Sequence, residues 1–92
     1  MRRAVHVVIT GRVQGVGFRA FVEREAEALR LDGWVRNRRD GTVEAVFAGD
    51  EGDIQHILME LNAGPPAAVV TDVQTGPYEG PIPTGFSSLP TA

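Results

Sequence analysis

The stretch GWVRNRRDGTVEAVF, residues 33–47, decides how the rest of the chain folds. Trp34-Val35 begins a strand, and Thr42–Phe47 has the apolar, β-branched composition of a second one. Between them Asn37–Gly41 is polar and ends in Asp40-Gly41, a strong turn signal. We therefore predict a β-hairpin in the middle of the chain, with its two strands antiparallel.

The segment before this hairpin predicts a strand, a loop and a helix. Ala4–Thr10 alternates in the manner of a strand, with Val5, Val7 and Ile9 on one face. Gly11–Gly17 holds three glycines in seven residues, which is typical of a loop with unusual backbone angles. From Phe18 to about Arg30 apolar residues recur at helical spacing, and Asp32-Gly33 is expected to break this amphipathic helix.

A second helix and strand follow the hairpin. Gly49–Asp53 is expected to be a loop that supplies an N-cap. The helix after it is marked by apolar residues at i, i+3, i+4 and i+7, namely Ile54, Ile57, Leu58 and Leu61. Gly64-Pro65-Pro66 ends that helix, and Ala67–Gln74 reads as a strand. Gly76–Gly85 is rich in Gly and Pro and predicts an irregular excursion, and Phe86–Leu89 has the length of a short terminal strand.

The predicted order is β-α-β-β-α-β. This order is typical of an α+β, ferredoxin-like sandwich, in which two helices cover one face of an antiparallel four-stranded sheet. Phe86–Leu89 would add a short fifth strand. The same fold carries enzymes, RNA-binding modules and metabolite sensors, so the function must be argued from a site.

Composition narrows the classes of function. The nine basic residues are all Arg and all lie in residues 1–39, where four carboxylates leave a net charge of +5, whereas residues 40–92 carry a net charge of −8. The absence of Cys excludes disulfides and thiolate chemistry, and the absence of Lys excludes Schiff bases. No apolar run approaches the roughly 20 residues of a membrane span. We expect one cytoplasmic domain, residues 1–92, with no membrane association.

The loop Gly11–Arg19 is the candidate functional segment. Backbone N–H groups of a glycine-rich loop before a helix can form an anion-binding nest. Arg19 would lie in the first helical turn, where a cation opposes the helix dipole unless an anion is bound. The residues alone fit an ordinary turn with a solvated Arg19 equally well. Gly15-x-Gly17-x-x-Ala20 also matches a dinucleotide fingerprint, but the next strand leads into a hairpin, so that interpretation is set aside.

Several segments together resemble the acylphosphatase family. They are VQGVGFR (13–19), GWVRN (33–37), DGTVEAVF (40–47) and, at residues 64–70, GPP-x-A-x-V. The resemblance extends from Val5 to about Val73. It implies that Arg19 and Asn37 are the catalytic residues, with Arg19 holding the phosphate and Asn37 orienting the attacking water. It also implies a phosphate-binding cradle formed by Gln14, Gly15, Val16, Gly17, Phe18 and Arg19.

The resemblance further implies hydrolysis of acyl phosphates to a carboxylate and inorganic phosphate. A carboxylate is a good leaving group, because the pKa of its conjugate acid is about 4. Positioning and charge stabilisation therefore suffice, and no metal or other cofactor is expected. Asn37 cannot act as a base, so we expect the proton of the water to go to the substrate phosphate or to solvent. The expected partners are an acyl phosphate and phosphate, and the expected state is a monomer.

Two other functions are weighed against this one. A non-catalytic phosphate- or metabolite-binding module would use the same Arg19 and Asn37. An RNA-binding module would need exposed aromatic side chains on the central strands, where Thr42–Ala48 offers only Phe47, and no nucleic-acid partner is expected.

The remaining polar and aromatic residues are expected to be structural. His6 and His56 have no partner at metal-ligand spacing, so no metal site is predicted. Trp34 and Phe47 are predicted to be core residues. Arg36, Arg38 and Arg39 flank Asn37 and are expected to raise the local phosphate concentration or to be solvated.

Overall fold

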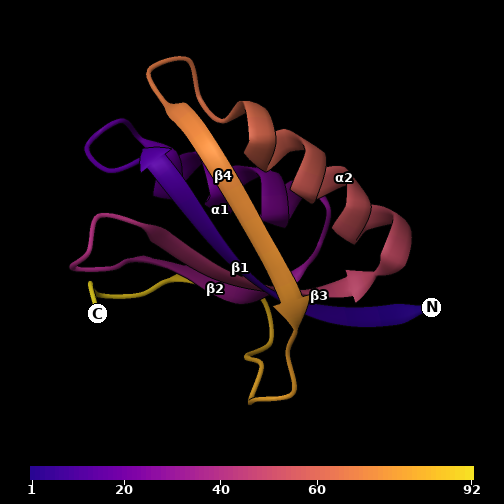
Figure 1. Cartoon of the computed structure of the whole chain (residues 1–92). Helices are drawn as coiled ribbons and strands as arrows, with labels where there is room; N and C mark the ends of the chain where they lie inside the picture. Colours follow the sequence, from indigo (N-terminus) through magenta and orange to yellow (C-terminus); the bar gives the residue numbers. More distant parts are fainter.

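The computed structural model describes residues 1–92 and contains five strands and two helices (Figure 1). In chain order these are β1 (Arg2–Arg12), α1 (Phe18–Ala28), β2 (Asp32–Asn37), β3 (Val43–Asp50), α2 (Glu51–Ala63), β4 (Val69–Pro77) and β5 (Phe86–Ser88). The predicted β-α-β-β-α-β order is confirmed. Neither α1 nor α2 combines the length and hydropathy that a membrane-spanning helix needs.

The strands form one sheet in the order β4-β1-β3-β2-β5, and both helices lie on the same side of it (Figure 1). The pairs β1–β3, β1–β4 and β2–β3 are antiparallel, as predicted. β5 pairs with β2 in parallel, with Gly33 opposite Phe86 and Val35 opposite Ser88. The short fifth strand therefore exists, but it makes the sheet mixed. The long irregular segment before β5 turns the chain round, so that β5 runs opposite to β4 and parallel to β2.

The core lies between the sheet and the helices. The apolar face of β1 contributes Val5, Val7 and Ile9, and α1 contributes Phe18, Val22 and Ala26. Helix α2 adds Ile54, Ile57 and Leu61, which are also fully buried. Phe47 belongs to this core as predicted, with its ring 5.5 Å from that of Phe86. Burial of this face drives the helices onto the sheet.

Val43 fixes the alignment of the strands at one end of the sheet. It is the register partner of Ile9 on β1 and of Asn37 on β2. Both strands run antiparallel to β3, so their carboxyl ends meet at the same end of the sheet. The sheet therefore brings the β1–α1 loop and Asn37 to the same end of the molecule.

Helix α1 ends earlier than the sequence predicts. Arg30 adopts the left-handed conformation, with φ of 56°, and its N–H donates to Glu27 O while Leu31 N–H donates to Ala26 O. This is a Schellman motif with Arg30 in the place that glycine usually takes. Asp32 and Gly33, expected to break the helix, instead begin β2.

Helix α2 and β4 also differ from the predicted bounds. The Asp50 carboxylate caps α2 by accepting a hydrogen bond from Gly52 N at 3.2 Å. Because the cap lies this early, residues 51–53 belong to the helix and not to a loop. β4 continues to Pro77 because its last residues pair with Val5 and His6 of β1.

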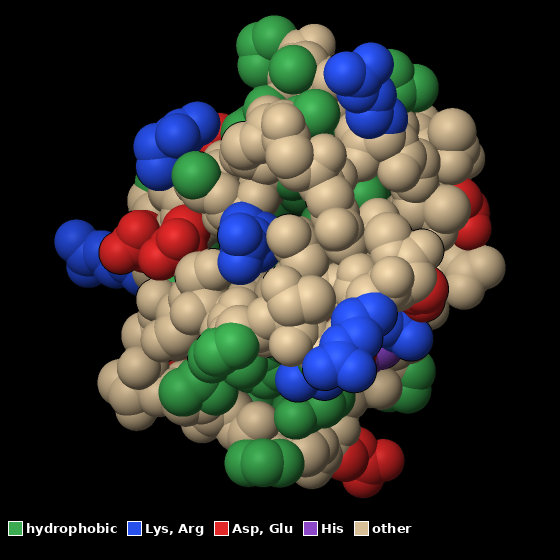
Figure 2. Space-filling model, turned by 90° about the vertical axis from the view of Figure 1, so that its left-hand side faces the viewer, with side chains coloured by type: hydrophobic (Ala, Val, Ile, Leu, Met, Phe, Trp, Pro, Cys, Tyr) green, Lys and Arg blue, Asp and Glu red, His purple; other side chains and the backbone are tan.

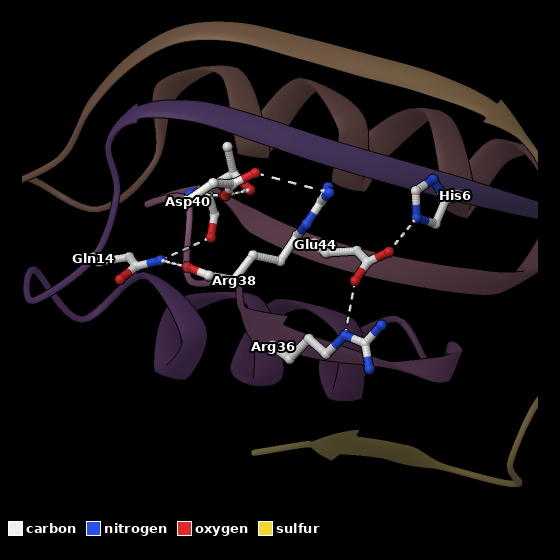
Figure 3. A network of polar contacts seen from close by, with 7 residues as sticks. His6, Gln14, Arg36, Arg38, Asp40 and Glu44 are labelled. Carbon is white, nitrogen blue, oxygen red and sulfur yellow. Dashed lines mark hydrogen bonds and ion pairs between the residues drawn. The ribbon is translucent and has the colours of Figure 1, made fainter. Parts of the chain in front are cut away.

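The face of the sheet away from the helices carries a polar network (Figure 3). His6 Nε2 lies 2.6 Å from one Glu44 oxygen, and Arg36 Nε donates to the other at 2.7 Å. The Arg36 guanidinium carbon lies 4.7 Å from the Trp34 ring centroid. The prediction that Trp34 is a core residue is wrong, since the side chains of β2 alternate and Trp34 takes the outer face with Arg36.

Replacing Arg30 by glycine is expected to stabilise the protein. Arg30→Gly removes the steric cost of the left-handed conformation, so the free energy of unfolding should rise by about 0.5–1 kcal/mol. Arg24→Gly, in the interior of the same helix, should lower it by about 1 kcal/mol. Urea denaturation measures both, and equal losses in the two variants would contradict the C-cap assignment.

Glu44 is expected to make stability depend on acid pH. Burial raises the pKa of Glu44, but hydrogen bonds from His6 and Arg36 together lower it more, so that the pKa lies below the ordinary 4.5. The stabilisation is therefore complete above that ordinary value and is lost as pH falls through the folded-state pKa. Glu44→Gln should cost about 1 kcal/mol at neutral pH and progressively less on acidification.

Denaturation of wild type and Glu44→Gln from about pH 7 to about pH 3 measures this difference. Glu27→Gln removes an exposed carboxylate with no ion pair and is the matched control. A constant difference between Glu44→Gln and wild type over the whole range would contradict the prediction.

Candidate active site

A pocket of about 200 Å³ opens between the β1–α1 loop and the end of β2. Its lining residues are Val13, Gly15, Gly17, Phe18, Arg19, Ala20 and Asn37. Arg19 and Asn37, the two predicted catalytic residues, thus lie at one pocket although 17 positions separate them in sequence. Three members of the predicted cradle, Gly15, Gly17 and Phe18, line it with them.

Two glycines give the loop its shape. Gly15 has φ of 71° and Gly17 has φ of 79°, both in the left-handed region. A Cβ at either position would meet no atom within 4 Å, so glycine is needed for backbone conformation and not for space. The loop can therefore turn sharply into α1 without filling the pocket.

The N-terminus of α1 keeps its hydrogen-bond donors free. Gly17 is the N-cap residue and offers no side-chain cap, and the first turn contains no acidic residue. The first helical hydrogen bond is donated by Phe21 N to Gly17 O, at 3.0 Å. The N–H groups before Phe21 have no intrahelical acceptor, so they are available to an anion in the pocket.

Arg19 is a half-buried cation without a protein counter-ion. No carboxylate lies within 4.0 Å of its guanidinium, while four other arginines take part in ion pairs. It stands in the first turn of α1, where the helix dipole repels positive charge. Both conditions favour an anion between the guanidinium and the free N–H groups.

Asn37 is the last residue of β2 and is held through its backbone. Its carbonyl oxygen accepts a hydrogen bond from Ala92 N at 3.0 Å, and it pairs with Val43 in the sheet. Its side chain makes no hydrogen bond to the protein and borders the pocket. The amide is therefore free to bind a substrate oxygen or a water molecule.

Gln14 and Val16 do not line the pocket, although both were predicted in the cradle. The Gln14 amide instead donates to Arg38 O at 2.7 Å and to Thr42 O at 2.9 Å, on the β2–β3 hairpin (Figure 3). Val13 and Ala20 line the pocket and were not predicted. The only signal in the sequence was that Val13 begins the VQGVGFR segment and that Ala20 directly follows it.

The end of the molecule that carries the loop displays several basic side chains, which in this chain are all arginines (Figure 2). Of the three arginines flanking Asn37, Arg36 is bound to Glu44 and Arg38 lies 3.8 Å from Asp40. Hydrogen bonds from the Thr42 hydroxyl and N–H lower the pKa of Asp40, so this carboxyl is ionised beside Arg38 at neutral pH. Arg39 has no ion pair, which leaves it as the flanking cation best able to attract an anion.

The two histidines lie away from the pocket. His6 is on the outer face of the sheet with Glu44, and His56 lies 3.8 Å from Glu60 on α2. No group of three or more His, Cys, Asp or Glu side chains is arranged to hold a metal ion.

Known proteins resemble this chain over nearly its whole length. The sequence pattern of the family described as Acylphosphatase matches residues 5–88. The acylphosphatase of Acidiphilium cryptum is 48% identical over 83 residues, which cover 90% of this chain and 91% of that protein.

Two solved structures agree in fold. The acylphosphatase from Coxiella burnetii has a TM-score of 0.91 at 36% identity, covering 96% of this chain and 93% of that one. The acylphosphatase from Bacillus subtilis has a TM-score of 0.89 at 38% identity, covering 97% and 99%.

Removing the unpaired cation is expected to stabilise the anion-free protein. Arg19→Ala relieves the repulsion by the helix dipole, so the free energy of unfolding should rise by about 0.5 kcal/mol in phosphate-free buffer. Arg24→Ala, on an exposed part of the same helix, is the control and should change it little. Added inorganic phosphate should raise the unfolding midpoint of wild type and of Arg24→Ala but not of Arg19→Ala. An Arg19→Ala protein that phosphate still stabilises would contradict the site.

Proposed function

The chain belongs to the acylphosphatase family, and from this premise we propose that its acyl phosphate hydrolysis takes place at the pocket between the β1–α1 loop and Asn37. We further propose a single domain over residues 1–92, supported by the family match over residues 5–88. A monomeric state and a cytoplasmic location stay predictions from the sequence.

The phosphoryl group is proposed to sit over the N-terminus of α1. Free N–H groups of the loop and the first helical turn would donate to its oxygens, and Arg19 would bind two oxygens at once. The observation that carries this proposal is that Arg19 is half-buried, has no counter-ion and lines the pocket beside the free N–H groups of the α1 N-terminus. The bound phosphoryl group would supply the missing negative charge.

The reaction then needs no strong acid. Water attacks phosphorus, the bond between phosphorus and the carboxylate oxygen breaks, and the electron pair leaves with the carboxylate. Because the pKa of the conjugate acid is about 4, the leaving oxygen needs no protonation at neutral pH. The negative charge on the phosphoryl oxygens is stabilised by Arg19 and the N–H groups.

Asn37 is proposed to orient the attacking water. Its side-chain carbonyl can accept a hydrogen bond from the water, and in the transition state its NH₂ group can donate to a phosphoryl oxygen. An amide is no base, so the proton passes to the phosphate or to solvent. Asn37 would therefore accelerate the reaction by positioning the water. This suffices because a loose phosphoryl-transfer transition state needs little activation of the nucleophile.

Two substitutions separate binding from turnover. Arg19→Ala should lower kcat/KM for an aryl acyl phosphate by at least about 100-fold and abolish inhibition by inorganic phosphate. Asn37→Ala should lower kcat by a similar factor while the inhibition constant of phosphate changes less than about 3-fold. Rates are measured without added metal.

Arg24→Ala and Asn62→Ala are matched controls, because both residues are exposed and lie outside the pocket. Full turnover by Asn37→Ala would exclude its role with the water. Phosphate binding by wild type without any turnover would favour the rival non-catalytic binding module.

A further inference from the structure

Gln14 joins the two parts of the proposed site. It lies in the β1–α1 loop, next to Gly15 of the pocket lining, and its side chain reaches across to the β2–β3 hairpin (Figure 3). Its acceptors, Arg38 O and Thr42 O, stand on the two sides of the hairpin turn. Arg38 follows Asn37 directly in the chain. One side chain therefore connects the loop to the segment that carries Asn37.

The sheet alone does not supply this connection. β1 and β2 are separated by β3, so no strand–strand hydrogen bond links the loop to Asn37. The sheet sets their spacing up to Ile9 and Val43, and β1 is irregular beyond that point, with a register shift between Thr10 and Gly11. The Gln14 contacts lie beyond this irregularity.

The contact needs a donor with two hydrogens. Both acceptors are carbonyl oxygens, and the NH₂ group of Gln14 donates one hydrogen to each of them. Each carbonyl also accepts a backbone hydrogen bond within the turn, from Gly41 N to Arg38 O at 3.1 Å and from Arg38 N to Thr42 O at 2.9 Å. Gln14 thus gives each of these two carbonyl oxygens a second hydrogen bond. The turn is already closed by its own backbone hydrogen bonds, and the added bonds come from the β1–α1 loop.

We propose that Gln14 is a positioning residue for the reaction: its amide fixes Asn37 at the distance from the loop that lets a water held by Asn37 face a phosphoryl group held by Arg19. Gln14 touches neither the water nor the substrate in this role. The inference rests on the proposed roles of Arg19 and Asn37. It assigns to Gln14 an effect on turnover and not on phosphate binding, because Gly15, Gly17 and Arg19 belong to one continuous segment.

Two variants test the proposal. Gln14→Leu removes the amide, and Gln14→Glu keeps its size but replaces the NH₂ group by an acceptor. Each should lower kcat by at least about 10-fold, since displacements near 1 Å have such effects, while the inhibition constant of phosphate changes less than about 3-fold. Thermal unfolding defines a temperature at which all variants are folded, and kcat is compared there.

The pH dependence of Gln14→Glu supplies a readout that lost packing would not give. A protonated carboxyl regains one O–H donor towards the hairpin. The ratio of its kcat to that of wild type should therefore rise as pH falls, whereas the ratio for Gln14→Leu should stay constant.

A double-mutant cycle shows whether Gln14 acts through Asn37. In the Asn37→Ala background, Gln14→Leu should lower kcat less than about 2-fold further, because no positioned water remains to be misplaced. Additive losses, or a parallel loss of phosphate affinity, would overturn the proposal. Full turnover by Gln14→Leu alone would overturn it and leave the proposed function intact, whereas full turnover by Asn37→Ala would overturn both this proposal and the proposed role of Asn37 with the water.

Discussion

The structure depends on the register at Val43, which pairs with Ile9 on one side and with Asn37 on the other. A slip of one residue on either side would turn every side chain of the slipped strand to the opposite face of the sheet. Asn37 would then point away from the helices and the pocket. Burial opposes such a slip, because in β2 it would turn Val35 out of the core and bring the Arg36 side chain into it. The same strand register therefore determines both the packing of the core and the geometry of the site.

The basic first part of the chain and the acidic second part form ion pairs with each other in the folded structure. Arg3, Arg36 and Arg38 pair with Glu51, Glu44 and Asp40, so carboxylates of the acidic half neutralise part of the basic half. Arg19 is left without such a partner at a helix N-terminus. A cation in that position opposes the helix dipole, and the proposed binding of a phosphoryl group would offset this repulsion.

The sequence predicts the order of elements and most of the pocket, since periodicity and turn residues act locally. It does not predict the contacts made at a distance. Arg30 ends α1 in a left-handed conformation and the next residue, Leu31, is buried in the core, yet no glycine marks this helix end in the sequence. The parallel pairing of β5 and the placement of Trp34 depend on which strand lies beside which. The two hydrogen bonds of Gln14 cross from one loop to another, so its sequence neighbours suggest the cradle and give no hint of the hairpin.

The pairing of β5 with β2 has a consequence for association between copies of the chain. Without β5, β2 would be an edge strand with a free row of N–H and C=O groups, and such an edge recruits strands from other molecules. β5 occupies that edge with three residues and is followed closely by Pro90, so the new edge is too short to extend. At the opposite edge, β4 carries Asp72 and ends in Pro77, which disfavour growth there as well. Both borders of the sheet thus resist intermolecular strand addition, the first step towards fibrous aggregates.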